Sequence, residues 1–403
     1  GSVGGVEHEL AAGTDPGREN ATSGVFPLLV AAAAGELAVA EVLLAHGASA
    51  VQANRISGEF PLLVAAGHGH AAIAEALLRY GADPAQLSTG STGMGASALH
   101  AAATNGHRDV VDLLLHHGAA PGQSSALGCT ALSLAACRGH AEVVESLLAH
   151  RADPSEANEA DGSPPLLLAA AEGHGPVVEL LLRHGAEASA MNVRDGSLPL
   201  LAAAQGGHLE ALEVLLRQGA DPDQLQPKTG AFALLEAAMH GHAAVALALL
   251  KRKADPNAHH EETGDFPLLQ AAAQGHTKVV DTLLRHGARP RRANRLSGSF
   301  PLLLAAEQGH FAAVDLLLRG GADPEQKHAR SGEKAVEAAE AAGHAETVDR
   351  LRRGRVLPVL LPQPGAERAE AQRAAERGKA SWAPLSGLLG VCVTPPRVEA
   401  ETA

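Results

Sequence analysis

Histidine is the residue type in this sequence that most invites a chemical role, because imidazole both binds metals and transfers protons. The chain contains 22 histidines among 403 residues. Nine of them follow a glycine and recur at intervals of 33 to 37 residues, from Gly69-His70 to Gly343-His344. Six more lie near the ends of predicted helices: His46, His116, His117, His150, His184 and His286. This spacing predicts a structural ladder, in which the first set ties neighbouring units and the second faces the negative ends of helices.

The other metal-binding and nucleophilic candidates are sparse. The only dense cluster, His259-His260-Glu261-Glu262, falls in a predicted loop and lacks a fixed ligand spacing, so we expect no metal there. Cys129, Cys137 and Cys392 show no paired spacing. This absence predicts a reducing compartment, and Cys129 and Cys137 are interpreted as buried or idle thiols.

No combination of nucleophile, base and acid stands out. The stretch GSTGMG at Gly90–Gly95 superficially resembles a phosphate-binding loop, but no strand is predicted before it and no lysine directly follows it. It fits better as an insertion between two repeated units. We therefore predict that the chain is not an enzyme and binds no cofactor.

Most of these residues belong to one repeated pattern, approximately GxxPLLxAAxxGHxxVVxLLLxHGADP. Each unit is anchored by a Pro or Ala at Pro27, Pro61, Ala98, Ala131, Pro165, Pro199, Ala233, Pro267, Pro301 and Ala335. The intervals between anchors are 34, 37 and 33 residues, and 34 thereafter. A fixed period in this range predicts a stack of supersecondary units, none of which can bury its apolar face alone.

One unit shows how the sequence sets its elements. Pro301 suits the first position of a short helix that ends before Gly309, and a second helix is predicted from Phe311 to Arg319. A glycine then ends that helix, and another glycine stands three residues before each anchor. This second glycine predicts a positive φ at the tip of a projecting hairpin, which we call a finger.

Two units lack the glycine that ends the second helix. Arg151 and Lys253 stand in its place. We expect both residues to be strained by a positive φ.

The combination of a short helix, a longer antiparallel helix and a finger resembles the ankyrin repeat. Ser97-Ala98-Leu99-His100 and Thr130-Ala131-Leu132-Ser133 come nearest to that family's T-P-L-H signature. The resemblance implies an all-α, ankyrin-type α-solenoid of about ten helix-turn-helix repeats with projecting hairpin fingers. Most units replace the signature Thr and His by Phe and Leu, so we expect packing to take the place of the Thr–His hydrogen bond.

Composition narrows the function further. Aromatic residues make up 2% of the chain and apolar residues 46%, which predicts a core of Leu, Val and Ala. A formal charge of −13 disfavours nucleic-acid binding, and no apolar run is long enough to span a membrane. We expect a monomer located in the cytoplasm, with the nucleus as a further possibility.

The period also sets the expected boundaries. Residues 1–23 are interpreted as a remnant or degenerate N-terminal half-repeat, residues 24–353 as the repeat array, and residues 354–403 as a mostly disordered tail. Within the tail, residues 366–379 form a helix candidate.

Five phenylalanines occupy the position just before a first helix: Phe26, Phe60, Phe232, Phe266 and Phe300. Phe is a poor helix cap, so something must offset its cost. Packing at the base of the finger is the favoured explanation, and exposed aromatic anchors for a partner are the alternative. A separate feature, the arginine-rich finger at residues 289–295, is either a solvated loop or a patch for an acidic partner segment.

The candidate partner-binding residues combine these patterns with the residues that precede each Gly-His. They are Arg55, Phe60, His68, Asn105, Arg138, Glu172, Met239, His240, Phe266, Gln274, Arg291, Arg292, Arg295, Phe300 and Glu307.

The resemblance implies a non-enzymatic scaffold or adaptor that binds one or more proteins through its concave face and fingers. The alternative is a substrate receptor of a ubiquitin ligase, in which the tail recruits the ligase. Leu388 and Cys392 have the spacing of an elongin-binding box, but Gly387 and Pro396 break its flanking pattern.

Overall fold

The computed structural model describes residues 3–89 and 95–353. These residues form 21 helices, none longer than nine residues, and none of the helices among them is long and apolar enough to cross a membrane. All the described residues belong to one compact unit.

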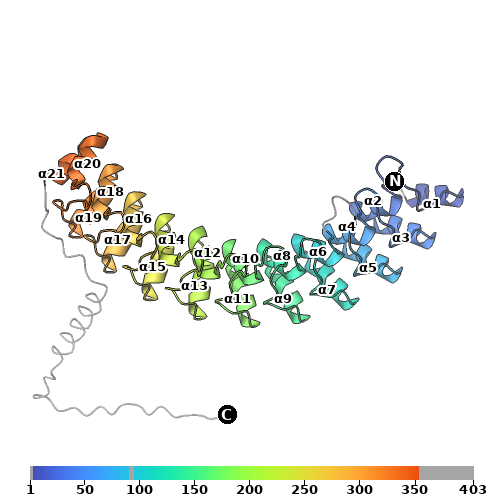
Figure 1. Cartoon of the computed structure of the whole chain (residues 1–403). Helices are drawn as coiled ribbons and strands as arrows, with labels where there is room; N and C mark the ends of the chain where they lie inside the picture. Colours follow the sequence, from blue (N-terminus) through green and yellow to red (C-terminus); the bar gives the residue numbers. More distant parts are fainter. Residues whose placement is uncertain (1–2, 90–94, 354–403) are drawn as a thin grey trace, which may run out of the picture. The chain divides into compact units, whose positions relative to one another are not determined.

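Ten helix pairs of the described residues stack side by side in one row, with the first helices along one side and the second helices along the other (Figure 1). The first helices are α2 (Pro27–Ala34), α4 (Pro61–Gly67), α6 (Ala98–Asn105), α8 (Ala131–Arg138), α10 (Pro165–Ala171), α12 (Pro199–Gly206), α14 (Ala233–Met239), α16 (Pro267–Ala273), α18 (Pro301–Glu307) and α20 (Ala335–Ala342). The second helices are α3 (Leu37–Ala45), α5 (Ala71–Arg79), α7 (Arg108–His116), α9 (Ala141–Ala149), α11 (Gly175–Arg183), α13 (Leu209–Arg217), α15 (Ala243–Lys251), α17 (Thr277–Arg285), α19 (Phe311–Arg319) and α21 (Ala345–Arg352).

Helix α1 (Val3–Ala11) packs beside α3, in the place of a second helix that has no first helix before it. Gly13, which follows α1, has φ 87°, close to the 91° of Gly47 after α3. The division of the chain at residues 23/24 and 353/354 stays a prediction from the sequence, and the predicted tail lies outside the described residues.

Proline and glycine set the helix boundaries as predicted. Pro301 is the first residue of α18, where its missing N–H would have no helical partner. Gly309, with φ 71°, lies between α18 and α19, and Gly321, with φ 94°, turns the chain after α19. The predicted solenoid of about ten helix-turn-helix repeats is confirmed.

The core is a continuous layer of small and aliphatic side chains shared between neighbouring pairs. In the ninth pair, Leu302, Ala305, Val314 and Leu317 are all fully buried. Alanine leaves room for helices to approach closely, and leucine and valine from the next pair fill the remaining space. Each pair therefore depends on its neighbours for burial.

The interpretation of the phenylalanines as exposed anchors is wrong. Phe60, Phe266 and Phe300 are between 0% and 1% exposed and belong to the core. Each is the extended residue before a first helix, with no side-chain cap hydrogen bond. The ring turns inward because its burial offsets the missing cap. The favoured alternative, packing within the stack, is confirmed.

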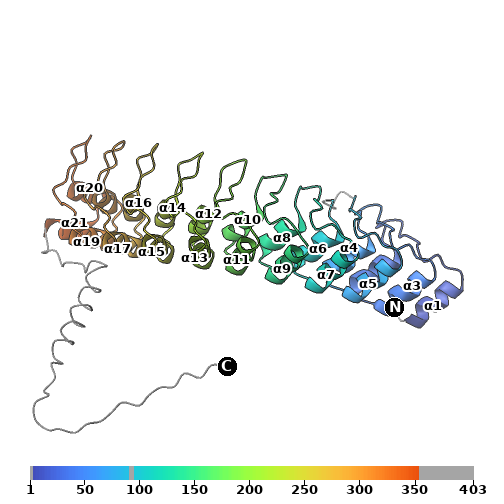
Figure 2. The same ribbon diagram turned by 90° about the horizontal axis from the view of Figure 1, so that it is seen from below.

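The fingers project from one side of the row (Figure 2). In the finger that precedes α4, the N–H of Asn54 donates to the carbonyl of Glu59 and the N–H of Gly58 donates to the carbonyl of Asn54, both at 2.7 Å. The ten tip glycines have φ between 58° and 86°, as predicted. Among the described residues these hairpins form no regular strand, and only Lys327 and Lys334 pair as an isolated antiparallel bridge.

Both predicted points of strain are present. Arg151 has φ 66° and Lys253 has φ 71°. They are the only residues other than glycine with a positive φ within residues 3–89 and 95–353.

The histidines form the predicted ladder. Nε2 of seven Gly-His imidazoles lies 3.0–3.1 Å from a carbonyl oxygen of the preceding repeat: His107, His140, His174, His242, His276, His310 and His344. Nδ1 of five rings at the ends of second helices lies 2.6–2.9 Å from the carbonyl four residues earlier: His46, His116, His150, His184 and His286. These bonds satisfy carbonyls that helix ends leave open.

Candidate protein-binding surface

Within the described residues, no three or more His, Cys, Asp or Glu side chains are placed to hold one metal ion. In the finger that carries the dense histidine cluster, His260 Nε2 bonds to the carbonyl of Thr229. Burial is the main cause that raises the pKa of the Cys129 and Cys137 thiols, with nearby carboxylates adding to it. A raised pKa lowers the fraction of the nucleophilic thiolate at neutral pH.

The stretch Gly90–Gly95 lies outside the described residues except for Gly95, and Cys392 and Leu388 lie outside them entirely. The phosphate-loop and elongin-box interpretations therefore stay predictions.

Most of the predicted binding residues lie on what we call the first-helix face, the exposed surface of the first helices together with the bases of the fingers. Eight of them are exposed at the C-terminal ends of first helices: His68, Asn105, Arg138, Glu172, Met239, His240, Gln274 and Glu307. Their even spacing follows from the repeat, so they are spread along the row and do not converge.

Two of these residues share a groove, which we call the amino-terminal groove. It runs across α2, α4 and α6 and has a volume of about 750 Å³. Leu29, Leu63 and Val64 line it, and Val30 is 52% exposed. His68 and Asn105 stand at its edge, where Asn105 Nδ2 donates to the carbonyl of Gly67 at 3.0 Å. The surface is apolar with polar edges, as in many protein-binding sites.

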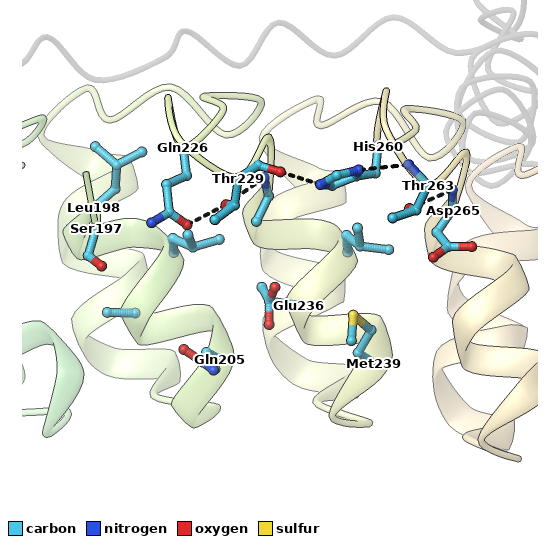
Figure 3. Close-up of a pocket in the computed structure, with 14 residues that line it drawn as sticks. Ser197, Leu198, Gln205, Gln226, Thr229, Glu236, Met239, His260, Thr263 and Asp265 are labelled. Atoms are coloured by element: carbon cyan, nitrogen blue, oxygen red, sulfur yellow. Dashed lines mark hydrogen bonds between the residues drawn. The ribbon is translucent and has the colours of Figure 1, made fainter. Parts of the chain in front are cut away.

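A second groove, the central groove, lies between α12 and α14, below the fingers that precede α14 and α16 (Figure 3). Its volume is about 380 Å³. The first helices contribute Leu201, Ala202, Gln205, Leu235, Glu236 and Met239, and the fingers contribute the polar wall. Met239 is 39% exposed and is the one predicted binding residue in this groove.

The polar wall is held in place by hydrogen bonds between fingers. Gln226 donates from Nε2 to the carbonyl of Asp195 at 3.1 Å and accepts from the Thr229 hydroxyl at 2.7 Å. Asp265 accepts from Asn294 Nδ2 at 3.0 Å, so the next finger fixes its carboxylate. These bonds between neighbouring fingers hold the polar side chains of the wall in place.

Glu236 is the one acidic side chain that the first helices contribute to the central groove. Its side chain is 16% exposed, and His240 Nε2 lies 3.5 Å from one carboxylate oxygen. No prediction from the sequence included it. The signal was available, since the same position of the other nine units holds Val, Ala, Leu or Gln.

The arginine-rich finger is only partly available to a partner. Arg291 Nε donates to the carbonyl of Gly321 at 2.8 Å, and Arg292 donates to the carbonyl of Asn257. The guanidinium carbon of Arg292 also lies 4.9 Å from the centre of the Phe266 ring. Desolvation lowers the pKa of Arg292, and the positive charge of Arg295 lowers it further. Two of the three predicted arginines therefore hold the fingers together.

Arg295 differs from the other two arginines. It is exposed and, with Arg289, lines a pocket of about 440 Å³ between two fingers. Arg55, at the equivalent position of an earlier finger, donates to the carbonyl of Ala21 and lies 3.5 Å from Glu19, so it serves the preceding finger.

Sequence reasoning also missed an amide ladder that links the fingers. Asn54, Asn192 and Asn294 each donate from Nδ2 to a carbonyl of the preceding finger, at 2.9–3.1 Å. Its trace in the sequence is an asparagine seven residues before the anchor in five of the ten units: Asn20, Asn54, Asn158, Asn192 and Asn294.

Comparison with known proteins gives the same fold. The family model described as ankyrin repeats (3 copies) matches in overlapping windows at residues 4–88, 28–125, 86–158, 132–226, 166–260, 200–294, 234–328 and 268–355. The crystal structure of the human ASB11 ankyrin repeat domain is similar, with a TM-score of 0.51 and 27% identity, covering 57% of this chain and 100% of that one. No curated protein sequence matches. The chain belongs to the ankyrin-repeat family.

Proposed function

We propose that this protein is a non-enzymatic scaffold or adaptor that binds protein partners through its first-helix face and fingers. Ankyrin repeats imply protein–protein interaction, and the two grooves suggest where on this chain it takes place. The observation that carries the proposal is the amino-terminal groove, where Val30 and Val64 leave an apolar surface next to the polar His68 and Asn105.

The chemistry of the face favours an extended protein segment. Apolar stretches of the face contribute affinity, and the polar residues at the helix ends fix the position of the bound segment along the row. The pocket at Arg289 and Arg295 would accept an acidic part of the same partner, because its lining carries three guanidiniums, including that of Arg292, and one carboxylate, that of Asp255. We further propose a monomer in the cytoplasm or nucleus.

A peptide-display selection against the full chain tests this function. Selected peptides are then measured against the double variant Val30→Asp/Met239→Asp, which places a charge in each groove. The matched control is Tyr80→Asp, since Tyr80 is 51% exposed at the end of a second helix.

We expect the groove variant to weaken the selected peptides by at least about tenfold and the control to leave them unchanged. If the groove variant binds as wild type, or if the control alone loses binding, the proposal is wrong.

A further inference from the structure

We propose that the central groove receives an arginine side chain of a partner segment, with the guanidinium on Glu236 and the aliphatic stem between Leu235 and Met239. This inference rests on the proposed function and adds to it the chemistry of one contact. Three observations support it: the identity of residue 236, the surroundings of its carboxylate, and the composition of the groove.

The identity of residue 236 is not needed by the fold. The equivalent position in the other units holds Val30, Val64, Ala101, Leu134, Leu168, Ala202, Gln270, Leu304 and Ala338. Nine units thus build the same helix pair without an acid. The packing of the repeat therefore does not explain the single acid in an otherwise apolar or neutral series.

The carboxylate of Glu236 has little compensation. Its side chain is 16% exposed, and its ion-pair partner is the imidazole of His240 at 3.5 Å, which is charged only when protonated. The carboxylate therefore has acceptor capacity left for hydrogen bonds from a cation that enters the groove.

The shape and lining of the groove select the kind of cation. Ala202 is small where Leu168 and Leu304 are large, and this opens space next to Glu236. Leu235 and Met239 form an apolar wall, and the carboxylate of Asp265 lies on the finger side (Figure 3). A long aliphatic stem with a charged head fits such a site.

Arginine fits this site better than lysine. Its planar guanidinium has five N–H donors and can bond to both oxygens of the Glu236 carboxylate at once. A lysine ammonium is more strongly hydrated and carries its charge at one point, so it would lose more on entering the groove.

The experiment uses the methionines of the full chain as reporters. The sequence has three methionines, Met94, Met191 and Met239, so isotope labelling of the methionine methyl groups gives three NMR signals, assigned by single Met→Leu variants. The probe is N-acetyl-arginine N-methylamide, titrated beside the same derivatives of citrulline and lysine. Citrulline keeps the shape of arginine without its charge.

The matched variants are Glu236→Gln and Glu213→Gln. Glutamine is already present at the equivalent position as Gln270, so Glu236→Gln is compatible with the fold. Glu213 is an exposed acid on the second helix α13 and serves as the control.

We expect the arginine probe to shift the Met239 signal saturably at millimolar concentration and to leave Met191 in place. Glu236→Gln weakens this binding by about tenfold or more, Glu213→Gln does not change it, and the citrulline probe does not saturate.

The inference is overturned if Met239 does not respond, if citrulline or lysine binds as well as arginine, or if Glu236→Gln keeps the wild-type affinity. Its failure is distinguishable from failure of the proposed function. Displayed peptides that lose binding to Val30→Asp/Met239→Asp would support the scaffold even when the arginine probe does not bind.

Discussion

Nε2 of His276 lies 3.0 Å from the carbonyl oxygen of Met239, so the last residue of α14 is held by the repeat that follows it. The side chain of Met239 lines the central groove. The same residue therefore belongs to the ladder that holds the stack together and to the surface proposed for binding.

His276→Ala removes this bond and leaves a helix-terminal carbonyl without its partner. We expect a loss of about 1 kcal/mol in the free energy of unfolding, measured by urea denaturation. The control is His259→Ala, because His259 is exposed in a finger. Equal stability of the two variants would show that the ladder contributes nothing.

Lys253→Gly should raise the melting temperature. Lys253 has φ 71°, a conformation that costs a residue with a side chain roughly 1–2 kcal/mol, and glycine removes this cost. The larger conformational entropy of glycine in the unfolded chain offsets part of the stability gained. The matched reversal is Gly287→Lys, which should lower the melting temperature. Gly287 has φ 91°, and no neighbouring atom lies within 4 Å of the place a Cβ would take. An unchanged or lower melting temperature for Lys253→Gly would refute the strain at this position.

Phe300→Ala should destabilise the array through its core and should not act through a partner. The ring is fully buried, and its removal costs roughly 3–5 kcal/mol in the free energy of unfolding. Phe311, which is only half-buried at the start of α19, provides the comparison Phe311→Ala with a smaller loss. Equal losses in chemical denaturation would contradict the assignment of the aromatic ring to the core.

His100 gives the third unit a specific pH dependence. Burial lowers the pKa of His100 below its usual 6.5. Its Nδ1 accepts from the N–H of Ser97 at 3.2 Å, and its Nε2 lies 3.0 Å from the carbonyl of Cys129, so the neutral ring is the one that fits. Below pH 6.5 this histidine binds a proton in the unfolded chain but stays neutral in the folded chain. The free energy of unfolding therefore falls until the pH drops below the pKa of His100 in the folded state.

The variant Ser97→Phe/His100→Leu copies the residues of the second unit, Phe60 and Leu63, and has no such group. The difference in unfolding free energy between this variant and wild type should move in the variant's favour as the pH falls from 7.5 through 6.5. A constant difference across that range would show that His100 does not titrate with folding.

The fold was predictable because one period accounts for nearly every apolar residue. Pro301, Gly309 and Gly321 mark a unit by backbone chemistry alone, and the structure places its helices between them. Side-chain direction was not predictable in the same way. A phenylalanine before a helix can turn inward or outward, and only the neighbouring repeat decides which.

The binding surface was predictable in place but not in chemistry. Position within the unit identified His68 and Met239 as exposed. It did not identify Glu236, because the prediction considered only the residues just before each Gly-His and not the odd acid earlier in the helix. Nor did it separate Arg292, which bonds to the preceding finger, from Arg295, which lines a pocket. Those distinctions depend on contacts between repeats, which the sequence pattern of one unit does not contain.

Site-specific photocrosslinking asks directly whether the first-helix face is the side of the row that binds a protein. A benzoylphenylalanine is placed at Val30 on the first-helix face or at Tyr80 at the end of a second helix, two positions that are 52% and 51% exposed. We expect irradiation in cells to join a discrete protein partner through position 30 and none through position 80. A partner captured only through position 80, or through neither, would contradict binding at the first-helix face.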